Sequence, residues 1–109
     1  LHEIRGLQLP IEKPWAKQVY WMYGVVLDDS LGLSASVFGA QLKELGVETR
    51  PFFLGMHKQP ALIERGLFHE EEYPVSERLA HQGLYLPSGL AITESQVDQV
   101  CDAITKIIF

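Results

Sequence analysis

The stretch VYWMYGVVLDD, residues 19–29, decides the fold expected for this chain. It is rich in β-branched and aromatic residues and ends in an acidic pair typical of a turn, so it predicts a strand. Its apolar run is nearly continuous, which indicates burial on both faces of a sheet. The other elements are therefore expected to pack around this strand.

A helix over residues 36–45 should follow the strand. The apolar residues that recur at helical spacing and form its stripe are Val37, Phe38, Leu42 and Leu45. Gly46 stands where a left-handed C-terminal cap belongs. The next segment, residues 47–54, alternates well enough for a second strand until Pro51, which implies an edge strand or a strand end.

The second half of the chain predicts shorter elements. We expect residues 60–65 to form a short helix closed by Gly66, and residues 75–82 to form one to two helical turns ended by Gly83. The segment LYLPSG, residues 84–89, then supplies a short apolar strand and a turn.

A closing helix is predicted by the segment TESQ, residues 93–96, which fits a capping box. The residues expected on its buried face are Val97, Val100, Cys101, Ile104 and Ile108. The order strand, helix, strand, short helices, short strand, helix folds most simply as a small sheet with helices packed on one side. The fold class is therefore α+β.

Composition limits the function classes. A chain of 109 residues, 47% hydrophobic and 21% charged, suits one soluble domain. The net charge of -5 argues against nucleic acid, and no apolar run approaches the roughly 20 residues that span a bilayer. The first residues lack the layout of a signal peptide, so we expect a cytoplasmic protein.

Cys101, the only cysteine, excludes an internal disulfide and is expected to be buried. Because the chain begins at Leu1, we also expect a piece of a longer polypeptide.

No self-contained catalytic centre is visible. Nucleotide-binding glycine loops, the GxSxG elbow, HExxH and CxxC are all missing, and the four histidines are too scattered to predict a metal site. The segments that remain are ETRPFFLGMHKQP, residues 48–60, and YLPSG, residues 85–89. In the first, Arg50 suits a carboxylate or phosphate, Phe52 and Phe53 offer apolar faces, and His57 offers an imidazole ring. The alternative is a strand end whose aromatic residues fill the core.

A resemblance to a known family covers nearly the whole chain, from about residue 19 to residue 104. The segments VYWMYGVVLDD, QLKELGVETRPFFLGMHKQP and PVSERLAHQGLYLPSGLAITESQVDQVCDAI resemble the C-terminal small domain of the PLP-dependent sugar-nucleotide aminotransferases of the DegT/StrS family, perosamine synthases above all. Ile92 stands where the family carries leucine, a mild departure.

The resemblance implies a two-layer domain with a mainly antiparallel sheet, as in type I aminotransferases. It implies a single domain over residues 1–109, with residues 1–18 as the connection from a large PLP-binding domain of the same chain. Arg50, Phe52 and His57 would bind substrate, and this piece would hold no catalytic residue, no cofactor and no metal.

The implied reaction of the parent enzyme is transfer of an amino group, from glutamate, to a nucleotide-linked keto-sugar. PLP would do the chemistry, and the parent would be a homodimer. The other hypothesis is a freestanding binding module that kept the fold without the chemistry. A longer reading frame upstream of Leu1 would favour the enzyme.

Overall fold

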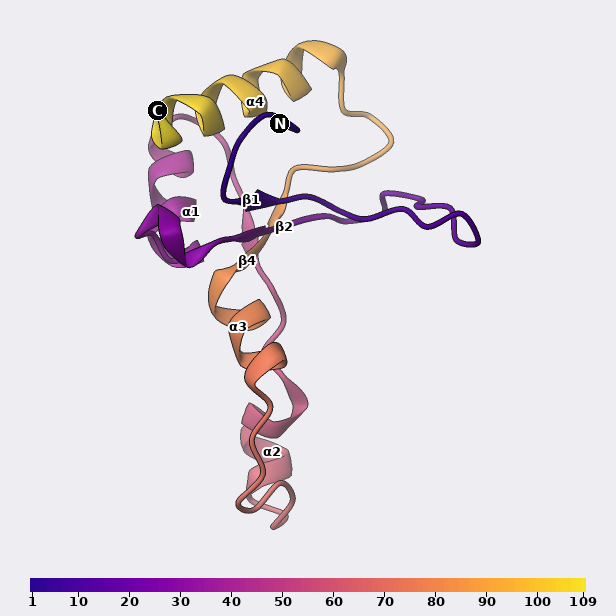
Figure 1. Ribbon diagram of the computed structural model, residues 1–109, viewed down its shortest axis with the longest axis vertical. Helices are drawn as coiled ribbons and strands as arrows, with labels where there is room; N and C mark the ends of the chain where they lie inside the picture. The colour runs from indigo at the N-terminus through magenta and orange to yellow at the C-terminus, as the bar shows by residue number, and fades with distance from the viewer.

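A computed structural model describes residues 1–109 and contains one antiparallel sheet (Figure 1). The elements in chain order are strand β1 (Leu7–Gln8), strand β2 (Tyr23–Leu27), 3₁₀ helix η1 (Asp29–Leu31), helix α1 (Ala35–Glu44), strand β3 (Arg50–Pro51), 3₁₀ helix η2 (Met56–Lys58), helix α2 (Pro60–Ile63), helix α3 (Pro74–Gln82), strand β4 (Gly83–Leu86) and helix α4 (Glu94–Ile108). The strands lie in the order β1-β2-β4-β3, and all neighbours are antiparallel. The predicted α+β class is confirmed.

The register of β2 and β4 assigns each central side chain to one of two faces. Directly paired residues of antiparallel strands project to the same side, and Val25 pairs with Leu84. Both belong to the hydrophobic core, as do Leu27 and Leu86, which lie two positions further along their strands. Val26 projects to the opposite side and is only 6% exposed. The C-terminal part of β2 is therefore buried on both faces, as predicted. Residues 19–22 of the predicted strand lie outside β2 and are not buried, since Val19 is 82% and Trp21 77% exposed.

Helices α1 and α4 cover the first face of the sheet. Phe38 and Leu42 of α1 are fully buried and meet Ile104 of α4 in the same core cluster. Burial of a side chain of this size stabilises a fold by about 1.5–3 kcal/mol. This packing produces the predicted arrangement of helices on one side of the sheet.

The predicted caps of α1 and α4 are confirmed, whereas α2 ends at Ile63, two residues before its predicted end. Gly46 adopts a left-handed φ of 81°, and the Val47 amide donates to the carbonyl of Leu42 at 2.9 Å, which is the bond of a Schellman cap. At the start of α4, the hydroxyl of Thr93 accepts a hydrogen bond from the backbone N–H of Gln96. The side-chain oxygen of Gln96 accepts one in turn from the backbone N–H of Thr93. Both caps satisfy backbone groups that the helices leave unpaired.

Three residues of the closing helix depart from the predicted buried face. Val97 is 44% exposed, and Cys101 and Ile108 are half-buried, whereas Val100 and Ile104 lie in the core. The first turns of α4 border an open groove beside the loop at residues 87–92, which explains the exposure of Val97.

The outer strands are shorter than expected, or were not predicted at all. The second predicted strand is reduced to the two residues of β3, because Pro51 has no amide hydrogen to extend the ladder. It is an edge strand, as the proline predicts. Strand β1 went unpredicted since two residues carry no periodic signal. It brings the start of the chain into the core, where Ile4 and Leu7 are each 8% exposed.

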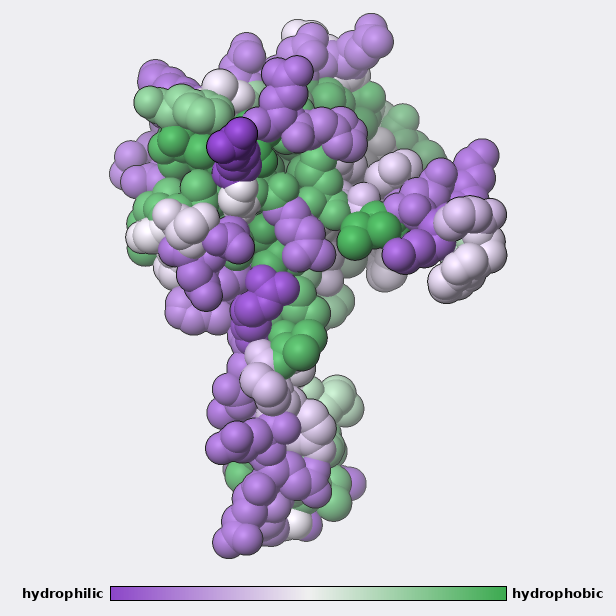
Figure 2. All heavy atoms as spheres, viewed as in Figure 1, coloured by the Kyte–Doolittle hydropathy of each residue, from purple (hydrophilic) through white to green (hydrophobic).

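The whole molecule measures 48 × 34 × 25 Å, and two segments project from its body (Figure 1). Residues 9–22 extend to one side, and residues 53–73, which we call the arm, carry η2 and α2 away from the sheet. Figure 2 shows hydrophobic residues gathered in the body, while the visible face of the arm is mostly hydrophilic.

Candidate functional site

Arg50 lies on β3 and is paired with Tyr85 of β4, which is paired in turn with Gly24 of β2. These three residues therefore project to the second face of the sheet, opposite the hydrophobic core. Arg50 is exposed, and neither ion pair of the structure includes it. Its guanidinium donors are thus available to a carboxylate or a phosphate.

Phe52 lies on the same face, over two glycines. A Cβ atom at Gly24 would come 2.9 Å from Cζ of Phe52, and one at Gly83 would come 2.3 Å from Cδ2. The phenylalanine ring stacks on Tyr85, with ring centroids 4.5 Å apart and planes inclined by 30°. Phe53 is 72% exposed. The aromatic residues of this stretch thus cover the second face and do not fill the main core.

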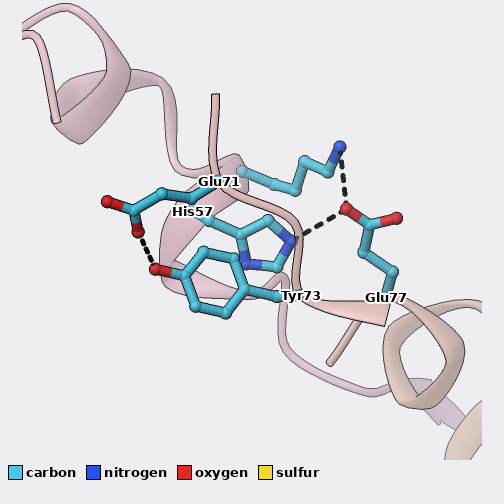
Figure 3. Close-up of polar contacts among 5 residues, drawn as sticks. His57, Glu71, Tyr73 and Glu77 are labelled. Atoms are coloured by element: carbon cyan, nitrogen blue, oxygen red, sulfur yellow. Dashed lines mark hydrogen bonds and ion pairs between the residues drawn. The ribbon is translucent and has the colours of Figure 1, made fainter. Parts of the chain in front are cut away.

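His57 occupies η2, where the arm meets the start of α3. Its side chain is 7% exposed, and its Nε2 lies 3.3 Å from Oε1 of Glu77. The contact has the distance of an ion pair, although its geometry is not that of a hydrogen bond. On the other side, the His57 ring packs against Tyr73 with centroids 4.8 Å apart. Figure 3 shows His57 enclosed between Tyr73 and Glu77.

The Glu77 carboxylate beside His57 also contacts a lysine. The ammonium of Lys58 lies 3.2 Å from the same oxygen of Glu77, and its hydrogen bond and charge, with a smaller effect from His57, lower the pKa of the Glu77 carboxyl. The hydroxyl of Tyr73 donates to Glu71, and this bond raises the pKa of the phenol. His57 therefore belongs to a polar cluster that joins η2 to α3.

The three residues predicted to bind substrate fall into two groups. Arg50 and Phe52 share the second face of the sheet, whereas His57 is held in the cluster at the base of the arm, and no hydrogen bond or ion pair links it to them. Tyr85 joins the first group, although its sequence position alone predicted no role for it. Its only signal was its place in YLPSG, because its neighbours come from strands distant in sequence.

A separate apolar groove of about 570 Å³ lies between the start of the chain, residues 19–23, the loop at residues 86–92 and the first turns of α4. Ser88 Oγ donates to the carbonyl of Trp21 at 3.0 Å and ties two of its walls together. Cys101 lines this groove, but none of the predicted substrate-binding residues does.

The lysines do not fit a site for PLP, which needs a lysine enclosed beside the reacting groups. All five are exposed on the surface, namely Lys13, Lys17, Lys43, Lys58 and Lys106. No group of three or more metal-ligating side chains is present, so the triple glutamate at residues 70–72 forms no such cluster. None of the helices has the length and apolar character that a membrane crossing requires.

An antiparallel sheet with helices on one face and an arginine among aromatic residues on the other defines a small α+β domain. Its sequence matches the DegT/DnrJ/EryC1/StrS aminotransferase family over residues 1–105. The chain belongs to this family, and the resemblance found from the sequence is confirmed.

Several curated relatives are GDP-perosamine synthases, and two of them cover most of this chain. The one from Vibrio cholerae is 27% identical over 104 residues, which are 94% of this chain and 28% of the relative. The one from Caulobacter vibrioides is 29% identical over 92 residues, which are 84% of this chain and 24% of the relative. The chain therefore spans about a quarter of the length of these relatives.

Solved structures agree with this assignment. DesI, determined in the presence of its TDP-sugar product, superposes with a TM-score of 0.83 at 27% identity, over 99% of this chain and 27% of its own. The aminotransferase TlmJ from Streptoalloteichus hindustanus gives a TM-score of 0.81 at 27% identity, over 99% of this chain and 28% of its own.

Proposed function

We propose that this chain is the C-terminal small domain of a PLP-dependent aminotransferase that transfers an amino group from glutamate to a nucleotide-linked keto-sugar. The observation that carries the proposal is the family match over residues 1–105. The substrate class is supported by the names of relatives, which include GDP-perosamine synthases and an enzyme with a TDP-sugar product.

In this proposal, the second face of the sheet is the wall that the domain contributes to a substrate cleft. Arg50 binds an oxyanion of the ligand, and Phe52 keeps the adjoining surface apolar. His57 belongs to the same cleft because it ends the family-like segment RPFFLGMH, residues 50–57. Its Nε2 faces Glu77, so it would reach a ligand by exchanging that carboxylate for the ligand.

The cofactor would be held elsewhere in the longer protein. PLP supplies an electron sink for amino-group transfer, and the exposed lysines of this chain offer it no enclosed partner. We therefore place PLP on a large domain of the same chain, with residues 1–18 as the connection to it. We also propose a homodimeric parent enzyme in the cytoplasm.

The complete polypeptide encoded by the gene that contains this sequence tests the proposal. Purified with PLP, it should aminate a nucleotide-linked keto-sugar at the expense of glutamate. The 109-residue chain should show no such activity and no PLP bound to one lysine after dialysis. A short gene product without activity would instead support a freestanding binding module. PLP that survives dialysis of the short chain on a single lysine would contradict the division of roles.

Substitutions test the two groups of site residues in the complete enzyme. Arg50→Ala and His57→Ala should each lower kcat/KM for the sugar nucleotide at least tenfold, about 1.4 kcal/mol. Arg65→Ala, which removes another exposed arginine, is the matched control and should leave kcat/KM unchanged. Normal kinetics in either test variant would remove that residue from the site.

A further inference from the structure

Tyr85 stands at the centre of the second sheet face. Its ring stacks on Phe52 at 4.5 Å and lies 5.9 Å from Phe53 at an interplanar angle of 56°. A Cβ atom at Gly24, its partner on β2, would come 3.5 Å from Cε1 of Tyr85, so the tyrosine ring also covers this glycine. Neighbours on several sides therefore hold the tyrosine ring in one orientation.

The pairing of β3 with β4 places Arg50 directly opposite Tyr85. Side chains at such positions start about 4.5–5.5 Å apart and can contact one ligand together. The Tyr85 hydroxyl takes part in none of the side-chain hydrogen bonds of the structure, in contrast to that of Tyr73, which donates to Glu71. A hydroxyl without a hydrogen-bond partner and an unpaired guanidinium thus project from directly paired positions on one face.

The surroundings of this pair suit a ligand that is anionic at one end and apolar at the other. Phe53 is exposed beside Tyr85 and offers an apolar surface against which a ring can lie. The rigidity of Tyr85 matters because a hydroxyl already held in place loses little freedom when it binds. A mobile tyrosine would contribute less.

We propose that Tyr85 is a specificity-determining residue, whose hydroxyl binds the same ligand oxyanion as Arg50 while Phe53 contacts the apolar part of the ligand. The inference rests on the proposed function and adds a residue to its cleft. The oxyanion is either the carboxylate of the amino donor or a phosphate of the sugar nucleotide, which share the ability to accept several hydrogen bonds.

Titrations of the complete isotope-labelled polypeptide followed by NMR test the inference, because the proposed cleft needs both domains. Separate titrations use glutamate, GDP and guanosine, since guanosine carries no phosphate. The amides of Arg50 and Tyr85 should shift with at least one anion and not with guanosine. A response to glutamate alone identifies the carboxylate, and a response to GDP alone identifies the phosphate. If every anion leaves both amides unchanged, the inference is overturned.

Tyr85→Phe removes the hydroxyl and keeps the stacked ring. It should weaken binding of the responding anion about tenfold, which corresponds to about 1.4 kcal/mol. Tyr20→Phe is the matched control, because Tyr20 stacks on Tyr23 away from this face, and it should bind as the unmodified chain does. Equal melting temperatures of the variants would show that the loss is not one of folding.

Arg50→Gln separates this inference from the proposed function. If Arg50→Gln loses binding while Tyr85→Phe binds normally, the role of Tyr85 is wrong and the substrate face of the proposed function stands. If neither substitution changes binding, Tyr85 and Arg50 both leave the site. Amination activity of the complete enzyme is measured separately and tests the proposed reaction whatever the role of Tyr85.

Discussion

Replacing Gly83 with alanine should destabilise the domain, because a methyl group has no room at this position. Gly83 has φ −96° and ψ 141°, which any residue adopts, so its backbone conformation is no obstacle. A Cβ atom would lie 2.3 Å from Cδ2 of Phe52 and 2.4 Å from the carbonyl oxygen of Leu79. The phenylalanine ring could shift, but the carbonyl belongs to α3 and could move only with the helix.

The size of the effect follows from two opposing contributions. Overpacking costs about 1–3 kcal/mol, and two obstacles at once place Gly83→Ala at the upper end of that range. Alanine also lowers the conformational entropy of the unfolded chain, which raises the free energy of unfolding by about 0.4–1 kcal/mol. We expect a net loss of about 2 kcal/mol, which lowers Tm by about 10 °C in a domain of this size.

Thermal and urea unfolding followed by circular dichroism measure this loss. Gly39→Ala is the control, since a Cβ atom there meets only Oγ1 of Thr49, at 3.0 Å, and that side chain can rotate. The same change in α1 should be neutral or stabilising by up to about 1 kcal/mol. If Gly83→Ala is as stable as the unmodified chain, the close packing of Phe52 on the sheet is refuted. The further substitution Phe52→Leu should restore part of the loss, because it removes one of the two obstacles.

Substitutions at four other positions test the N-terminal cap of α4, its buried face and the charge cluster. Thr93→Ala should lower the free energy of unfolding by about 1 kcal/mol in urea titrations, and Thr93→Ser should retain most of it. Ile104→Ala should cost about 2–5 kcal/mol, whereas Val97→Ala should change stability by less than about 0.5 kcal/mol; equal losses would contradict the orientation of α4. The pKa of Glu77, read from its carboxyl resonance, should lie below its ordinary value and rise in Lys58→Met. Because folding lowers the pKa of Glu77, its carboxylate stabilises the folded state above the unfolded pKa, and this stabilisation is lost as the pH falls through the folded pKa. The free energy of unfolding of Lys58→Met should therefore fall less between about pH 5 and pH 3 than that of the unmodified chain. An unchanged Glu77 pKa in that variant would rule out the lysine as its cause.

The helices could be predicted well because their determinants are local. Gly46 and the pair Thr93 and Gln96 end or begin a helix through bonds to residues fewer than six positions away. The strands were harder, since a strand is stabilised by a partner that can lie anywhere in the chain. Strand β1 was missed because the partner that stabilises it, β2, lies about 20 positions later in the chain.

The candidate site likewise combines features set by local sequence with features set by contacts between distant segments. The sequence by itself determined the family, the caps of α1 and α4 and the presence of a cation beside aromatic rings in RPFF, residues 50–53, because these depend on residue type and short spacing. Tertiary structure decided which of these residues share a surface. It placed Tyr85 opposite Arg50 through the pairing of β3 with β4, and it enclosed His57 between Tyr73 and Glu77. The physical reason is that accessibility and ligand geometry arise from contacts between segments distant in sequence, which form only when the sheet and the arm have folded.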